Sequence, residues 1–280
     1  MILNRFEEIA ERYDAVFCDV WGVIHNGRRL YPGAGEALSA FRAAGKAVIL
    51  LTNIPKPRGP IPAQLDRLGF PRDAYDVIVT SGDAIRAELA ARAPGPMFKI
   101  GPPRDAALWE GLGLAQAPLD TARFVAISGL NDDEETPEAY AGVLAAARAR
   151  ELEMLCANPD IVVRVGDHLM WCAGAVARDY AKLGGRVIMA GKPHAPIYAL
   201  AFEELARLRP NTARARVLCI GDGAPTDVRG ANDQGLDCLF IASGMHGEAL
   251  MTRGALDDEK VSAALTAEGV RADYVMAGLA

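Results

Sequence analysis

Short apolar runs recur along the chain, and most of them are followed by a stretch with helical periodicity. The runs predict strands at 15–20, 46–52, 76–81, 123–129, 153–158, 185–191, 216–222 and 236–243. Several are almost continuous in Val, Ile and Leu, which is typical of parallel strands buried on both faces. Amphipathic stretches lie between them, as at 33–45, 136–152 and 195–208. This alternation indicates an α/β fold with a doubly wound, Rossmann-like parallel sheet.

Composition and charge narrow the class of protein. The chain has 280 residues, 51% of them hydrophobic, which is enough for one large domain or two ordinary ones. A formal net charge of −6 and the lack of a basic cluster argue against a nucleic-acid partner. No apolar run reaches membrane-spanning length, and the charged N-terminal stretch does not resemble a signal peptide. The five cysteines form no CxxC pair, so we expect a cytoplasmic protein without a zinc site.

Polar residues gather where predicted strands end. Ligands of open α/β sheets bind beyond the carboxyl ends of the strands. Such residues follow four of the predicted strands, and they are Asp19, Thr52 with Asn53, Lys192, and Asp222 with Asp227. Each alone is more often part of a turn or a helix cap. Together, three carboxylates, a hydroxyl, an amide and an ammonium suit a divalent cation beside a phosphate group.

The order of these residues resembles the haloacid dehalogenase (HAD) superfamily, specifically its class IIA phosphatases. The matching segments are DVWG at 19–22, LLTN at 50–53, GKP at 191–193 and GDGAPTD at 221–227. The resemblance covers nearly the whole chain. It implies a core made of residues 1–79 and 187–280, with an α/β cap domain inserted at 80–186. Segments at 80–85, 128–132, 156–160 and 172–176 resemble landmarks of that cap.

The resemblance also implies a function, namely a Mg²⁺-dependent phosphoric monoester hydrolase that acts on a small phosphorylated metabolite. Asp19 would attack phosphorus and form an aspartyl-phosphate. Lys192 would neutralise the phosphoryl group, and Thr52 and Asn53 would help to bind it. A homo-oligomer is compatible with the sequence, which does not determine the oligomeric state.

The same resemblance implies a metal site. Mg²⁺ would be held by Asp19, the backbone carbonyl of Trp21 and Asp222, with Asp227 bound directly or through water. Because the Trp21 ligand is a backbone atom, its side chain does not affect this expectation.

The chain departs from the family pattern at Trp21, where the family has a second Asp that protonates the leaving group and then activates water. An indole N–H donates a hydrogen bond but is no base. Loss of a general acid/base typically costs about 10²–10⁴-fold. Three outcomes are open: a slow phosphatase, a replacement base, or a non-catalytic protein that binds a phosphorylated ligand or a partner. A further possibility is cleavage of a carbon–phosphorus or carbon–halogen bond, as in superfamily members that also lack this Asp. The carbon–halogen reaction is the least favoured, because it needs no metal and Asp222 and Asp227 are retained.

Four further residues are candidates for a role near the substrate. His25 is the nearest replacement base, since an ordinary histidine pKa suits proton transfer near neutrality, although a turn hydrogen bond is the favoured interpretation. His246 is a weaker candidate. Asn158 and Asp160 would select the substrate from the cap, and an Asn-Pro turn is an equally good interpretation of this pair.

Overall fold

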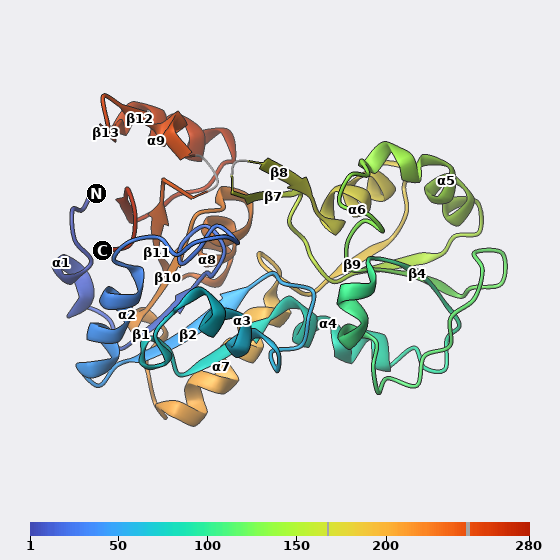
Figure 1. Ribbon diagram of the computed structural model, residues 1–280, viewed down its shortest axis with the longest axis horizontal. Coiled ribbons are helices and arrows are strands. Elements are labelled where there is room, and N and C mark those ends of the chain that lie inside the picture. Colours follow the sequence, from blue (N-terminus) through green and yellow to red (C-terminus); the bar gives the residue numbers. More distant parts are fainter. Residues whose placement is uncertain (167, 245–246) are drawn as a thin grey trace.

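A six-stranded parallel sheet forms the core of the computed structural model, which describes residues 1–166, 168–244 and 247–280 (Figure 1). The sheet order is β14-β11-β10-β1-β2-β3. The strands are β1 (Ala15–Cys18), β2 (Ala47–Thr52), β3 (Val77–Thr80), β10 (Val217–Gly221), β11 (Asp237–Ile241) and β14 (Tyr274–Met276). The chain runs outward from β1 on one side and from β10 on the other. The strand order therefore reverses between β1 and β10, where a ligand site is expected.

Helices cover both faces of this sheet. One face packs on α1 (Glu7–Ala10), α2 (Ala34–Ala43) and α3 (Ile61–Leu68), and the other on α4 (Ser81–Ala90), α7 (Ala195–Leu208), α8 (Arg229–Gln234) and α9 (Asp258–Ala267). Successive residues of a strand point to opposite faces. Val16 accordingly lies in one apolar cluster and Phe17 in the other. The predicted doubly wound fold is confirmed.

A second parallel sheet forms the smaller lobe, coloured mainly green in Figure 1. Its order is β4-β5-β6-β9, with β4 (Met97–Ile100), β5 (Phe124–Ile127), β6 (Glu153–Cys156) and β9 (Val187–Met189). Helices α5 (Ala141–Ala149) and α6 (Ala173–Lys182) cover one face. On the other face, Leu155 belongs to the same apolar cluster as Leu89 of α4. Apolar packing is therefore continuous between the two lobes.

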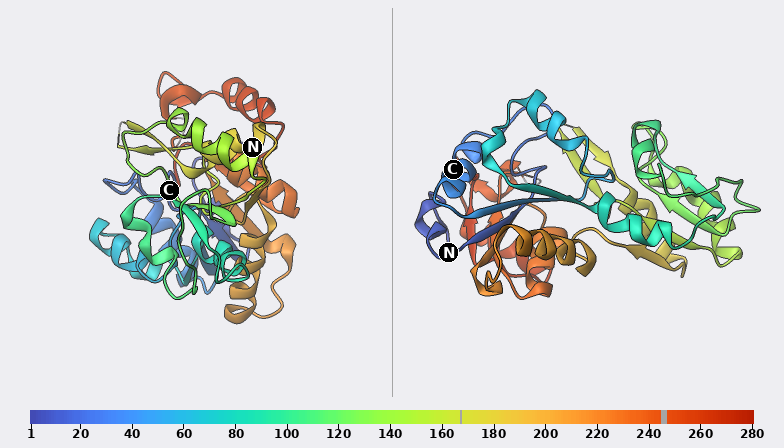
Figure 2. Two further views of the ribbon diagram at one scale, coloured as in Figure 1. Left: turned by 90° about the vertical axis from the view of Figure 1, so that its right-hand side faces the viewer. Right: turned by 90° about the horizontal axis from the view of Figure 1, so that it is seen from below.

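A hairpin of β7 (Val162–Val165) and β8 (His168–Trp171) lies between the lobes (Figures 1 and 2). The remaining strands are β12 (Met251–Thr252) and β13 (Ala255–Leu256). Short helical turns span Arg72–Ala74, Pro103–Leu108, Pro137–Tyr140, Arg214–Arg216, Ala224–Val228 and Gly247–Leu250. Across the described ranges, we find no helix with both the length and the apolar character of a membrane span.

One predicted boundary needs correction. We expected the strand at 185–191 to belong to the core, but β9 pairs with β6 of the smaller sheet. An apolar run predicts a buried strand without indicating which of two parallel sheets it joins, which explains the error. We therefore keep the division into a core and an inserted cap as a proposal, with the second boundary moved beyond Met189.

Candidate active site

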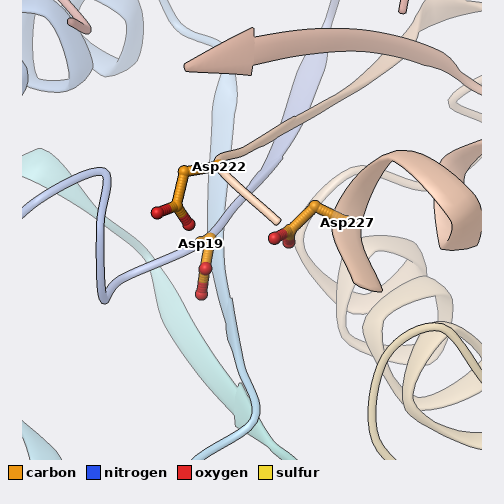
Figure 3. A group of neighbouring side chains, drawn as sticks. All are labelled: Asp19, Asp222 and Asp227. Carbon is orange, nitrogen blue, oxygen red and sulfur yellow. The ribbon is translucent and has the colours of Figure 1, made fainter. Parts of the chain in front are cut away.

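Three carboxylates meet at the reversal of strand order (Figure 3). Asp19 follows β1 and Asp222 follows β10, its neighbour in the sheet. Asp227 lies in the helical turn that leads into α8. One oxygen of each carboxylate lies within 4.8 Å of the others, and no side chain of the three is more than a tenth exposed. Hard oxygen donors at this spacing suit a divalent cation.

Close backbone packing fixes this arrangement. Gly22 adopts a φ of 89°, in the left-handed region, and a Cβ at this position would lie 2.0 Å from Oδ2 of Asp222. Only glycine combines that backbone conformation with that approach. The glycine that ends the DVWG motif therefore brings the loop after β1 against the carboxylate that follows β10.

The ammonium of Lys192 lies among the carboxylates. Its Nζ is 2.7 Å from Oδ1 of Asp19 and 2.7 Å from Oδ1 of Asp227. Lys192 follows β9, so the prediction that it ends a core strand is wrong, although it still reaches the core site. The ammonium of Lys192 therefore lies on the segment that connects the cap back to the core.

The charges in the cluster do not balance. Three carboxylates and one ammonium carry two excess negative charges when all are ionised. Burial is the main cause that raises the pKa of Asp19 to about 8; Lys192 opposes this rise and Asp227 adds to it. Burial alone would lower the pKa of Lys192, but the two carboxylates outweigh it and raise that pKa. A bound divalent cation would balance the excess, so the donor set fits such an ion.

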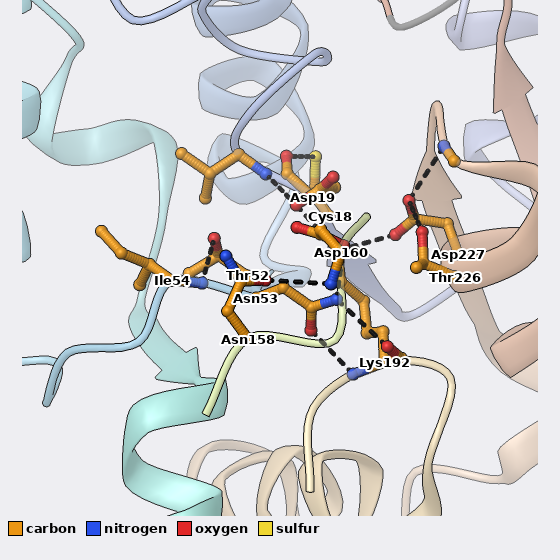
Figure 4. Close-up of polar contacts among 12 residues, drawn as sticks. Cys18, Asp19, Thr52, Asn53, Ile54, Asn158, Asp160, Lys192, Thr226 and Asp227 are labelled. Carbon is orange, nitrogen blue, oxygen red and sulfur yellow. Dashed lines mark hydrogen bonds and ion pairs between the residues drawn. The ribbon is translucent and has the colours of Figure 1, made fainter. Parts of the chain in front are cut away.

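The predicted phosphate-binding residues lie beside this cluster (Figure 4). Thr52 ends β2, and its Oγ1 accepts the N–H of Ile54 at 3.4 Å. The amide of Asn53 binds both backbone groups of Lys192: Oδ1 accepts from N at 2.7 Å, and Nδ2 donates to O at 3.1 Å. Asn53 therefore holds Lys192 in place. Contact of Thr52 or Asn53 with phosphate stays a prediction.

Asp160, a residue of the cap, contacts the core residue Asn53. Oδ1 of Asp160 accepts a hydrogen bond of 2.8 Å from Nδ2 of Asn53. The Asn-Pro turn is also present, because Oδ1 of Asn158 accepts the N–H of Asp160 at 3.0 Å. The two interpretations of this pair are compatible, since the turn brings Asp160 to the core. Substrate selection by either residue stays a prediction.

Trp21 and His25 lie together on the loop after β1. Nε1 of Trp21 donates a 2.7 Å hydrogen bond to the backbone oxygen of Arg164 in the hairpin. Nδ1 of His25 accepts the N–H of Gly27 at 3.0 Å, which confirms the predicted turn hydrogen bond. Burial lowers the pKa of His25 to about 4. The weaker candidate, His246, lies outside the described residues.

Two cavities of about 420 Å³ each adjoin the site. Both are lined by Trp21, Thr52, Asn53, Asp160 and Val163. One contains the three carboxylates, and the other extends beneath the cap.

The cavity beneath the cap is lined by two charged residues that the sequence did not identify as candidates, Lys56 and Asp105. Nζ of Lys56 lies 3.7 Å from Oδ1 of the buried Asp105. Lys56 lies in the Pro-rich segment 53–62 that follows β2, and no sequence signal marked Asp105.

Comparisons with known proteins agree with this geometry. Residues 16–115 match the family described as haloacid dehalogenase-like hydrolase, and residues 189–276 match a second family described as HAD-hydrolase-like. A crystal structure of a haloacid dehalogenase-like hydrolase from Brucella suis 1330 is 44% identical, with a TM-score of 0.89 over 99% of this chain and 100% of that one.

A curated sequence and a crystal structure from Mycobacterium tuberculosis are more distant matches. D-glycerol 3-phosphate phosphatase of Mycobacterium tuberculosis is 28% identical, covering 86% of this chain and 66% of its own length. A crystal structure of glycerol phosphate phosphatase from the same species, in complex with calcium, is 28% identical, with a TM-score of 0.62 over 87% of this chain and 71% of that one. From its motifs, its fold and these matches, the chain belongs to the haloacid dehalogenase-like family of hydrolases, in the class IIA branch.

Proposed function

We propose that the protein is a slow, Mg²⁺-dependent phosphatase that hydrolyses a small phosphomonoester through an aspartyl-phosphate on Asp19. One observation carries the proposal: the Asp19 carboxylate lies beside an ammonium at the reversal of strand order, within a ligand-sized cavity. A site that only bound phosphate would be weakened by a facing carboxylate, because the two anions repel. A site that transfers phosphate needs such a nucleophile.

Hydrogen bonds orient the proposed nucleophile. Oδ1 of Asp19 accepts from the N–H of Val20 at 2.7 Å and contacts Nζ of Lys192 at the same distance. Oδ1 is thus held by two donors, and we propose that Oδ2 attacks the phosphorus atom. Lys192 also neutralises negative charge that develops on the transferring group.

The donor set of Asp19, Asp222 and Asp227 supports a divalent ion, and the relative in complex with calcium adds to that support. We propose Mg²⁺ as the ion, with the Trp21 carbonyl as a further ligand. When bound, the ion would supply positive charge to the phosphoryl group.

The second half of the reaction lacks an evident base. The indole of Trp21 has no basic atom and its N–H is already bonded to the hairpin, so it activates no water. His25 is a poor replacement, because its Nδ1 is occupied and its pKa is lowered to about 4. We infer that hydrolysis of the aspartyl-phosphate limits turnover. The same facts favour the second candidate function, a phosphate-ligand-binding or interaction protein without turnover.

Rapid mixing with p-nitrophenyl phosphate distinguishes the two functions. Nitrophenolate needs little protonation to leave, so we expect a fast burst of one equivalent, followed by slow steady release. The burst should require Mg²⁺ and be absent from Asp19→Asn. If the unmodified protein releases nitrophenolate no faster than Asp19→Asn, the phosphatase proposal is wrong and the binding function is favoured.

The cavities indicate the size of the substrate. Volumes of about 420 Å³ suit a metabolite rather than a polymer, and the matches from Mycobacterium tuberculosis are named as phosphatases of glycerol phosphate. We propose a small phosphorylated metabolite in the cytoplasm, and a panel of phosphomonoesters with and without Mg²⁺ tests this proposal.

A further inference from the structure

The hairpin of β7 and β8 is held against the loop after β1 by two hydrogen bonds. The indole N–H of Trp21 donates to the backbone oxygen of Arg164 at 2.7 Å. The N–H of Gly166 donates to the backbone oxygen of Asn26 at 3.1 Å. Gly166 also packs on Arg28, since a Cβ there would lie 3.0 Å from Cδ of that side chain. The contacts join a core loop to a cap element across 138 residues or more of sequence.

The core side of this junction is rigidly built. The N–H of Gly22 donates to the backbone oxygen of His25 at 2.9 Å, and the ring of His25 packs edge-on against Trp21 with 5.0 Å between centroids. Gly27 lies directly against the indole, because a Cβ there would be 2.5 Å from Cη2 of Trp21. The indole is thus seated on its own loop with its N–H directed towards the hairpin.

The cap side has little apolar anchorage. Among the described residues, neither β7 nor β8 contributes to the three buried apolar clusters. Leu169 and Trp171 of β8 are 57% and 39% exposed. The position of the hairpin therefore depends strongly on polar contacts such as the bond from Trp21.

The hairpin also forms a wall of both cavities. Val163 lines both of them, Arg164 lines the one with the carboxylates, and Met170 lines the one beneath the cap. A displacement of the hairpin would therefore change the shape of both cavities together.

We propose that Trp21 is a positioning residue that fastens the β7–β8 hairpin over the site. At a position where the family pattern has a proton-transfer group, this chain has a donor that closes the junction between core and cap. The inference goes beyond the phosphatase proposal, because it concerns the place of the hairpin and holds whether or not Asp19 turns over a substrate.

Hydrogen–deuterium exchange of the full chain tests the inference without an activity assay. Trp21→Phe keeps an aromatic ring and removes the N–H. Losing one hydrogen bond of about 1–1.4 kcal/mol should raise exchange of the β7, β8 and Gly166 amides about fivefold to tenfold. Amides of β2 and β5 should be unchanged.

Trp109→Phe is the matched control. It makes the same chemical change at an indole N–H that is buried without a hydrogen-bond partner among the described residues. It should leave exchange in the hairpin unchanged. The proposal is overturned if Trp21→Phe also leaves the hairpin unchanged, or if its exchange rises equally in all strands, which indicates a general packing role.

A spectroscopic measurement on the unmodified protein keeps the test independent of how well Trp21→Phe folds. The chain has three tryptophans, so Trp109→Phe and Trp171→Phe assign their indole N–H resonances by loss and leave the third to Trp21. The Trp21 indole should exchange with solvent at least about tenfold more slowly than that of Trp171. Equal rates would show that the bond to the hairpin does not persist in solution.

Discussion

At position 21 an indole stands two residues after a carboxylate that has the geometry of a nucleophile. Its N–H is directed to a backbone oxygen of the hairpin rather than towards a reacting group. The side chain therefore differs from an aspartate in two ways, because it has no proton-transfer capacity and it adds a contact between lobes. Exchanging the two residue types should alter both properties.

Trp21→Asp should restore an acid/base group. For alkyl phosphates, whose leaving groups need a proton, we expect kcat to rise by up to about 10²-fold, with a smaller gain for p-nitrophenyl phosphate. Steady-state rates with both substrates measure the difference. Trp21→Asn is the control, because it has nearly the same size as aspartate but no titratable group. Equal gains in both variants would assign the effect to packing instead.

Lys192 should matter for folding as well as for chemistry. Removing one partner of a buried ion pair leaves uncompensated charge, so Lys192→Met should lower the free energy of unfolding by about 3–5 kcal/mol in metal-free protein. Urea denaturation measures the loss. Lys182→Met removes an exposed partner of Asp179 and should cost at most about 1 kcal/mol. Similar losses for both variants would contradict the buried pairing.

His25 should give the protein an acid-sensitive stability. Its folded pKa of about 4 lies below its ordinary value of 6.5 because burial disfavours the charged ring. The unfolded chain therefore binds more protons between these values, and stability falls as the pH falls. Between pH 7 and pH 5 this loss should be about 2 kcal/mol greater than in His25→Asn, which keeps an acceptor for Gly27. Parallel pH profiles of the unfolding free energy would contradict the prediction.

Among the elements, most parallel strands were predictable and the exposed hairpin was not. All eight apolar runs contain strands, because burial on both faces leaves a run of Val, Ile and Leu in the sequence. β7 and β8 have partly exposed side chains and leave no such run. β4 is interrupted by Lys99 and is only half-buried at its centre. β14 is buried and as long as β9, so its length does not explain why it was missed. β9 was found but placed in the wrong sheet, since sheet membership depends on tertiary packing.

The loop after β1 allows a test that separates strain from crowding. Gly22→Ala meets an unfavourable φ of 89° and the carboxylate of Asp222, whereas Gly69→Ala meets a φ of 82° with no atom within 4 Å. Gly69→Ala should cost about 1 kcal/mol of unfolding free energy. Gly22→Ala should cost more and abolish stabilisation by Mg²⁺. Thermal denaturation with and without Mg²⁺ measures both effects, and retained stabilisation in Gly22→Ala would argue against the proposed metal site.

At the scale of the whole molecule, the site is assembled from both lobes. The family motifs identified Asp19, Lys192, Asp222 and Asp227 because each follows a strand in a fixed local pattern. The contact of Asp160 with Asn53, by contrast, joins two lobes, and the bond between Trp21 and Arg164 does the same. Such pairs leave no local trace in the sequence, because they depend on where the cap lies relative to the core.

Metal binding should stabilise the molecule as a whole. An ion that binds only the folded state adds about 2.7 kcal/mol at one hundred times its Kd. We expect the Tm to rise with Mg²⁺ concentration, and to rise much less in Asp222→Asn. Differential scanning calorimetry measures this shift. A Tm that is independent of Mg²⁺ in the unmodified protein would contradict a magnesium site, and Ca²⁺ can be compared in the same experiment.

The pairing of β9 with β6 has a consequence for exchanging modules between proteins. A cassette cut at 80 and 186 would leave β9 with the recipient core, strip an edge strand from the donor sheet and expose the backbone edge of β6 to aggregation. A cut placed after Met189 would keep that sheet whole. The graft junction would then fall within three residues of Lys192. The donor's β9 would have to join the recipient chain in a register that keeps the recipient's lysine in its place in the site. Transplanting this cap is therefore inseparable from rebuilding part of the site.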